Sequence, residues 1–441
     1  MISDSQSKLQ VLLDIAAFYG KMYRVTYGAS KTKVTVIGSE VDMKYYRDVA
    51  PWTLDGLTVS VTEDNDHLGQ VVSGVNQEQK NVDTRIEKGR KNLFGMLGAA
   101  FAYKCLLSPV VKIHLFRTYT CPILRSGLSS FSLRTTDLEP LALNHRKILR
   151  GILTLSKSSN IPALHFLLGE LPMEAKIHRD VFSLFYSVWS NPGSKIYQIV
   201  KYLLENSPDN SRTWAVHLRY LSLKYGLKDP LECLKTDPPA KSHYKEDIQT
   251  KICAYFENSL RAKAESNSLM EYLNVSLTGL RGRHHPALSY IITTQEVQKC
   301  RIHLKMLAGD YLTYEVKSNQ SGGSPHCRCC SPASTETENL LHILTICDSY
   351  SDIRERIVTE YSNLCDQSKN EISMQHITSD KKIFCQFILD PSSFNLTKRV
   401  HMNDPVLIPL FKTSRDYCFA VNSRRMKILK NKEKAAQLIT L

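Results

Sequence analysis

Three cysteines and one histidine between residues 327 and 347 are the side chains best suited to chemistry. Cys327, Cys330, His342 and Cys347 follow the spacing C-x2-C-x11-H-x4-C. Zn²⁺ favours four nitrogen or sulfur ligands in a tetrahedron. A C-x2-C pair can supply two thiolates from one tight turn, and an H-x4-C pair places an imidazole and a thiolate about one helical turn apart. The spacing therefore predicts a zinc knuckle that holds one structural Zn²⁺.

The run HCRCC at 326–330 leaves the first pair of ligands ambiguous. Cys329 could replace Cys330, and His326 is adjacent. The alternative to a metal site is a group of reduced, partly buried cysteines. The spacing of the other cysteines shows no secreted disulfide framework, which favours a reducing compartment where such clusters bind metal. Structural zinc that docks the C-terminal region and direct RNA contact both fit this knuckle.

The positive charge is concentrated along the chain rather than spread over it. The net charge is +14 over 441 residues, yet residues 1–78 hold 7 Lys/Arg against 10 Asp/Glu. Residues 79–157 hold 14 Lys/Arg against 4 Asp/Glu. Such a concentration favours a polyanionic partner, most simply nucleic acid, although a solvated helix face is the alternative. The same choice applies to residues 421–441, which could instead be an import signal or a disordered arm.

The sequence predicts helices and strands in the N-terminal part of the chain and mostly helices after it, and these elements would position the metal ligands and the basic residues. Apolar residues at helical spacing predict a helix from Leu9, which Gly20 can end. Strands are expected at 33–37, 57–61 and 67–72, with a turn at 63–66 whose acids are solvated rather than bound to metal. Helical patterns begin at Val82 and continue through 139–153 and 173–189. Turn-rich stretches at 228–243 and 318–325 read as linkers. No apolar stretch is long enough to span a bilayer, so we expect a soluble intracellular protein with no membrane partner.

Four segments, in this order, resemble the C-terminal half of reverse transcriptases from non-LTR (LINE-type) retrotransposons. The opening SDSQSKLQVLLDIAAFYGKMYRVTYGASKTKVTVIG is similar to the helix and Lys-Thr strand that follow the catalytic aspartates of the palm. HLGQVVSG is similar to the strand that grips the primer end. RIEKGRKNLFGMLG through HRKILRGILTL resembles the thumb, and CRCC…ETENLLHILTIC resembles the knuckle common after it.

The resemblance implies an α+β chain with five regions. These are a remnant of the palm at 1–78 (short antiparallel strands plus a helix), a basic helical thumb at 79–157, a helical connecting region at 158–300, a zinc knuckle region at 301–365 and a C-terminal tail with a basic end at 366–441.

The resemblance also identifies residues that would contact nucleic acid. Lys31 and Lys33 match the position of a lysine near the incoming triphosphate, although lysines that protect a strand edge are the preferred interpretation. Basic residues of the first thumb helix would contact phosphates of RNA or of an RNA–DNA duplex, independently of sequence. They are Arg85, Lys88, Arg90 and Lys91. A further basic cluster, RGRHHP at 281–286, fits a loop with exposed imidazoles better than a second metal site.

Catalysis is not expected from this chain alone. The family holds two metal ions on palm aspartates, one of them in a Phe/Tyr-x-Asp-Asp turn that would lie before Met1. The sequence contains no Asp-Asp pair, so Mg²⁺ is expected only for an enzyme extended upstream. Asp390-Pro391 lacks the arrangement of the nuclease found in some related elements. The leading interpretation is a non-catalytic fragment of an RNA-directed DNA polymerase that binds nucleic acid through thumb and knuckle. The alternative is a domesticated RNA- or DNA-binding or interaction protein.

Overall fold

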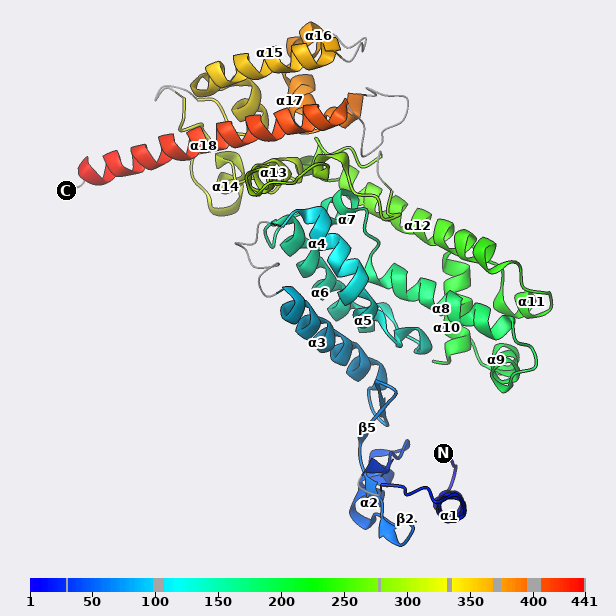
Figure 1. The fold of residues 1–441 in the computed structure, drawn as a ribbon. Coiled ribbons are helices and arrows are strands. Elements are labelled where there is room, and N and C mark those ends of the chain that lie inside the picture. Colours follow the sequence, from blue (N-terminus) through cyan, green and yellow to red (C-terminus); the bar gives the residue numbers. More distant parts are fainter. Residues whose placement is uncertain are drawn as a thin grey trace.

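A computed structural model describes residues 1–28, 31–97, 107–276, 279–330, 335–367, 374–394 and 406–439 (Figure 1). Residues 98–106 of the expected thumb and 331–334 of the expected knuckle therefore lie outside the described residues. The described chain is mostly helical with a few short strands, which is consistent with the expected α+β class. None of its helices is long and apolar enough to cross a membrane.

The N-terminal part consists of two helices and three small sheets. Its elements are α1 (Gln6–Tyr23), β1 (Lys33–Val34), α2 (Glu40–Val49), β2 (Thr53–Leu54), β3 (Leu57–Thr58), β4 (Ser60–Val61), β5 (Asp64–His67) and β6 (Gln70–Ser73). β1 pairs with β4 in parallel, whereas β2–β3 and β5–β6 are antiparallel. A small core that includes Leu13, Trp52 and Val59 joins α1 to these strands. Figure 1 shows this part at one end of the molecule, connected through β5 to α3.

Two local expectations for this part were wrong. The turn expected at 63–66 is mostly strand β5, and the hairpin instead turns at Leu68 and Gly69, which have φ angles of 50° and 80°. Positive φ at both central residues is the geometry that matches the twist of a two-residue hairpin. Gly20 does not end α1, which continues to Tyr23. A Cβ on Gly20 would lie 2.7 Å from the carbonyl oxygen of Val25, so this glycine permits close packing of the returning chain.

The middle of the chain is built from helices that pack around two hydrophobic cores. The helices are α3 (Gln77–Leu97), α4 (Pro109–Leu115), a π-helical turn (Phe116–Thr120), α5 (Cys121–Arg125), α6 (Thr135–Leu153), α7 (Ile161–Leu168), α8 (Met173–Trp189), α9 (Lys195–Asn206), α10 (Trp214–Lys224), α11 (Pro230–Leu234) and α12 (Lys241–Glu265). One core joins α3–α7 to the C-terminal helices, and a second is centred on α8, α10 and α12. The stretch 228–243, expected as a linker, contains α11, whose Cys233 and Leu234 are buried in the second core.

The C-terminal helices surround the cysteine–histidine region. They are α13 (Thr294–Leu307), α14 (Tyr314–Ser321), α15 (Ser351–Gln367), α16 (Met374–Ser379), α17 (Lys381–Leu389) and α18 (Leu407–Ile439). Figure 1 shows α18 running alongside α13, with α15 on its other side. Leu410, Phe411 and Val421 of α18 are buried. Each such side chain contributes roughly 1.5–3 kcal/mol by leaving water. The segment expected as a tail is therefore in large part a helix of the main core.

Candidate metal centre

The four predicted metal ligands come together in one compact cluster. The ligand atoms of Cys327, Cys330, His342 and Cys347 all lie within 4.8 Å of one another. The Sγ atom of Cys330 lies 3.3 Å from Nε2 of His342 and 3.3 Å from Sγ of Cys347. The Sγ atoms of Cys327 and Cys347 are 3.9 Å apart. Tetrahedral zinc with Zn–S bonds of about 2.3 Å separates its sulfur ligands by about 3.8 Å, so the cluster could bind a zinc ion.

Backbone hydrogen bonds position the two halves of this cluster. The N–H of Cys327 donates to the carbonyl oxygen of Glu336 (2.8 Å), and the N–H of Glu338 donates to that of Pro325 (2.8 Å). His342 begins a π-helical turn that ends at Ile346, and the N–H of Cys347 closes this turn by donating to the carbonyl oxygen of His342 (2.8 Å). The H-x4-C pair is therefore held by a π-helical turn and not by the α-helical turn that its spacing predicted.

The geometry favours Cys330 over Cys329 as the second ligand. Cys329 lies instead in a smaller group with Cys327 and Glu338. The carboxylate of Glu338 already accepts the N–H of Tyr314 (3.0 Å) and pairs with the guanidinium of Arg425 (2.6 Å). The smaller group offers three ligand atoms and no histidine, so the larger group matches the four-ligand set of a structural zinc site better. His326 is exposed and outside the cluster, and its backbone pairs with Thr337.

Neighbouring thiols of the cluster shift one another's pKa values. Hydrogen bonds from the thiols of Cys329 and Cys347 lower the pKa of the Cys327 thiol. The same contact with Cys327 raises the pKa of the Cys347 thiol, since that proton stabilises the neighbouring thiolate. Bound Zn²⁺ would replace these protons, because thiolates are its ligands. His342 Nδ1 is buried without a partner among the described residues, so the ring's one polar contact there is that of Nε2 with Cys330 Sγ.

An ion pair between Arg425 of α18 and Glu338 holds the metal region against the C-terminal core. Arg425 and Glu338 are both buried, with side chains 5% and 0% exposed. The guanidinium of Arg425 also lies over the rings of Tyr311 and Tyr314. Removing one member of a buried pair typically costs 3–5 kcal/mol, because the other charge is left uncompensated. The basic C-terminal cluster thus has a structural use that the sequence did not indicate.

Two further basic residues of α18 contact this region from more exposed positions. The guanidinium of Arg424 pairs with Asp352 at the start of α15, and Lys432 donates to the carbonyl oxygen of Arg328 inside the C-x2-C turn (2.7 Å). The side chains of the remaining basic segment beyond Glu433, that of Lys434 among them, lie outside the described residues.

The structure buries one of the residues expected to contact nucleic acid and leaves the others exposed. Arg85 is 7% exposed, and its Nη2 donates to the carbonyl oxygen of Gly69 (2.7 Å), so it joins α3 to the β5–β6 hairpin and cannot reach a phosphate. Lys88, Arg90 and Lys91 are exposed on α3, as expected. Lys31 and Lys33 are also exposed, the latter on β1, which pairs on one side only with β4.

Much of the charge in residues 79–157 is used within the fold. Arg117, Arg125, Arg134 and Arg146 pair with carboxylates, and Arg150 donates to Ser159. Among the described residues of this segment, Lys88, Lys147 and Lys157 are exposed and have no hydrogen bond or ion pair. The charge count alone therefore overstated the surface available to a polyanion.

The RGRHHP cluster differs from the expected loop with exposed imidazoles. His285 is fully buried, with Nε2 3.3 Å from Asp390 and Nδ1 accepting the N–H of Ala287 (3.2 Å). Burial lowers the pKa of half-buried His284 to about 4. The exposed side chains are instead those of Arg281 and Arg283. No pattern in the sequence distinguished the buried histidines from exposed ones.

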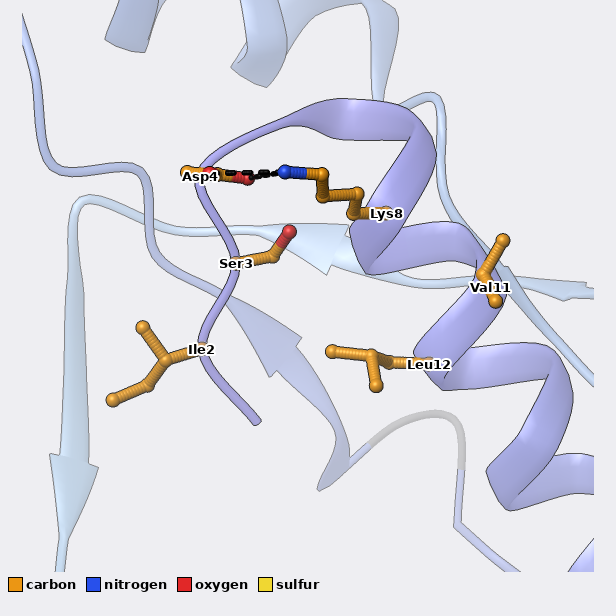
Figure 2. A pocket seen from close by; sticks show the side chains of 6 residues that line it. All are labelled: Ile2, Ser3, Asp4, Lys8, Val11 and Leu12. Atoms are coloured by element: carbon orange, nitrogen blue, oxygen red, sulfur yellow. Dashed lines mark hydrogen bonds and ion pairs between the residues drawn. The ribbon is translucent and has the colours of Figure 1, made fainter.

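A separate hollow lies against α1 in the N-terminal part of the chain (Figure 2). It is lined by Ile2, Ser3, Asp4, Lys8, Val11 and Leu12, and Figure 2 shows Asp4 and Lys8 pointing toward each other across it. These two charged side chains pair at 3.0 Å in an exposed position. The rest of the lining is largely apolar, so this hollow has no set of groups for acid–base chemistry.

No known family model matches this chain, and no curated protein matches it.

Proposed function

We propose that this chain is a non-catalytic nucleic-acid-binding unit of the reverse-transcriptase type, with residues 1–78 as the remnant of a palm and α3–α6 as a thumb. The observation that carries the proposal is the exposed basic surface of α3. Lys88, Arg90 and Lys91 are exposed on this helix. The proposed partner is RNA or an RNA–DNA duplex, bound through its phosphates independently of sequence.

The neighbouring helix α6 extends this surface. α3 packs along α6, and Nε of Arg90 donates to Oδ1 of Asn144 (3.0 Å), which fixes the two helices side by side. Exposed Lys147 follows Asn144 by about one turn of α6. Lys91 pairs with exposed Glu87 among the described residues, and such exposed pairs contribute little, so a phosphate can replace the carboxylate.

The N-terminal part supports the palm assignment through its uncovered surface. Val11, Ile15, Phe18 and Met22 lie at helical spacing on α1 and are exposed, Phe18 by 67%. A contiguous apolar face of this kind marks a site where another protein surface packs. The strands beside it form only two-stranded sheets, which have marginal stability without further partners.

The zinc centre has a structural part in this proposal. It would join the C-x2-C turn, the π-helical turn and, through Glu338 and Arg425, the helix α18. Catalysis is not part of the proposal, because the sequence contains no Asp-Asp pair to hold Mg²⁺.

Fluorescence anisotropy with a labelled RNA–DNA duplex tests the proposal. Each phosphate contact contributes a slope of about −0.9 to the dependence of log K on log salt, so K88A/K91A/K147A should reduce the slope by up to about 2.7. The control is K195A/K201A, which removes two exposed charges of the same sign from α9, so the two sets are compared per charge removed. Absence of salt-dependent binding by the wild-type chain would overturn the proposal, as would equal effects of the two sets of substitutions.

A further inference from the structure

We propose that Arg281 and Arg283 form a second phosphate-contacting element, presented by a loop that the fold clamps in place before any ligand arrives. This inference rests on the proposed nucleic-acid-binding function and adds a surface outside α3 and α6. Neither arginine belongs to the basic segment 79–157 or to the basic C-terminal cluster.

The backbone of the loop is held at three points. The N–H of Gly282 donates to the carbonyl oxygen of Gly169 (2.9 Å), and the N–H of His285 donates to that of Leu167 (2.8 Å). The N–H of Leu280 donates to Oε1 of Glu257 on α12 (2.6 Å). Arg281 and Arg283 stand between these clamped positions and are exposed. The loop therefore has little freedom to lose when a ligand binds.

A half-buried arginine reinforces the clamp. Arg117, in the π-helical turn after α4, donates through Nη1 to the carbonyl oxygen of Gly282 (2.9 Å) and through Nη2 to that of Leu168 (2.7 Å). Its Nε donates to Oε2 of buried Glu170 (2.8 Å), which also pairs with Lys176. These charge-assisted hydrogen bonds hold the loop and the end of α7 as one unit.

The end of α7 is shaped to receive this loop. Gly169 caps the helix with φ of +58°. A Cβ atom there would lie 1.9 Å from the carbonyl oxygen of Arg283 and 2.5 Å from its carbonyl carbon. Only glycine can occupy this position while the backbone of Arg283 lies so close.

The two guanidinium groups are not neutralised by the carboxylates of the clamp. Glu170 is paired with Arg117 and Lys176, and Glu257 accepts Leu280 N–H with Arg261 at 4.0 Å. Arg283 has no hydrogen bond or ion pair within the described chain, and Arg281 reaches only the hydroxyl of Thr250 (3.4 Å).

A further cation, Arg179, contacts the same stretch of α12 as Arg281. It donates to Gln249, the residue before Thr250 on α12 (2.7 Å). Guanidinium groups match phosphate geometry through paired N–H donors, and a preorganised backbone lowers the entropic cost of binding.

The test uses the full chain, the same labelled RNA–DNA duplex and the double substitution R281A/R283A. Because both side chains are exposed, circular dichroism and thermal unfolding should match those of the wild type. The salt slope should fall by up to about 1.8, at about 0.9 for each lost phosphate contact. K195A/K201A again serves as the control of equal charge, since Figure 1 shows α9 well separated from α7, where the loop is anchored.

The outcomes separate this inference from the function on which it rests. If the wild type binds, K88A/K91A/K147A reduces the slope and R281A/R283A leaves it at the control value, the inference is wrong and the proposed function stands. If R281A/R283A reduces the slope and the control does not, the inference is supported. If the wild type does not bind the duplex, both are overturned.

Discussion

The substitution Gly169→Ala tests how strongly the end of α7 determines the position of the arginine loop. Two effects of the added Cβ set the expected loss in the free energy of unfolding. A left-handed conformation costs a non-glycine residue about 1–2 kcal/mol, and Gly169 has φ of +58°. The added Cβ would lie 1.9 Å from the carbonyl oxygen of Arg283, so one backbone segment must move, which typically costs a further 1–3 kcal/mol. The expected destabilisation is therefore roughly 2–5 kcal/mol, concentrated where the loop meets α7.

Amide hydrogen exchange of the peptide that covers residues 279–290 measures this cost locally, because exchange reports the free energy of opening for that segment. The matched control is Gly226→Ala, where φ is +62° and a Cβ would meet nothing within 4 Å. Gly226→Ala should therefore lose only the about 1–2 kcal/mol that the left-handed conformation costs a non-glycine residue. Equal stability losses in the two variants, or unchanged protection of residues 279–290 in Gly169→Ala, would refute the argument that the loop is seated on this glycine.

Two further predictions concern buried charge. Arg425→Gln should lower the free energy of unfolding of the C-terminal region by about 3–5 kcal/mol, since it leaves Glu338 buried without its cation, whereas Arg424→Gln should cost at most about 1 kcal/mol because its pair with Asp352 is largely exposed. Similar losses in denaturant titrations of these two variants would contradict this. Burial lowers the pKa of His303 from 6.5 to about 4, so the unfolded chain takes up a proton in this interval that the folded chain does not. Stability should therefore fall as pH decreases from 6.5 toward 4, and His303→Gln should make this dependence shallower; an unchanged slope of unfolding free energy against pH would show that His303 does not contribute.

The sequence predicted the metal cluster better than it predicted which charged side chains are exposed. Ligand spacing is local, so C-x2-C and H-x4-C identified four residues whose ligand atoms lie within 4.8 Å of one another. It could not distinguish Cys329 from Cys330, because that choice depends on which thiol the folded turn brings to His342 and Cys347, and Cys330 lies 3.3 Å from both.

Charge patterns wrongly predicted exposure for basic residues that tertiary contacts bury or pair. Arg85 and Lys88 are both basic residues of the same helical segment, yet Arg85 is buried against the β5–β6 hairpin. The buried state of His285 depends on Asp390, which follows it by more than 100 residues. The basic residues near the C-terminus looked like a tail, but apolar positions on the same helix pack against α13 and α15. Helical periodicity located α3, α6 and α8 well, because amphipathic spacing is a property of each helix alone.

The central claim is that Cys327, Cys330, His342 and Cys347 bind one zinc ion, and metal analysis of purified protein tests it most directly. We expect one zinc per chain in the wild type and in Cys329→Ser, and a clear loss of zinc in Cys330→Ser, because Cys330 lies 3.3 Å from both His342 Nε2 and Cys347 Sγ. A wild-type chain that binds no zinc when supplied with it would contradict the claim. Equal zinc loss in Cys329→Ser and Cys330→Ser would contradict the choice of ligands.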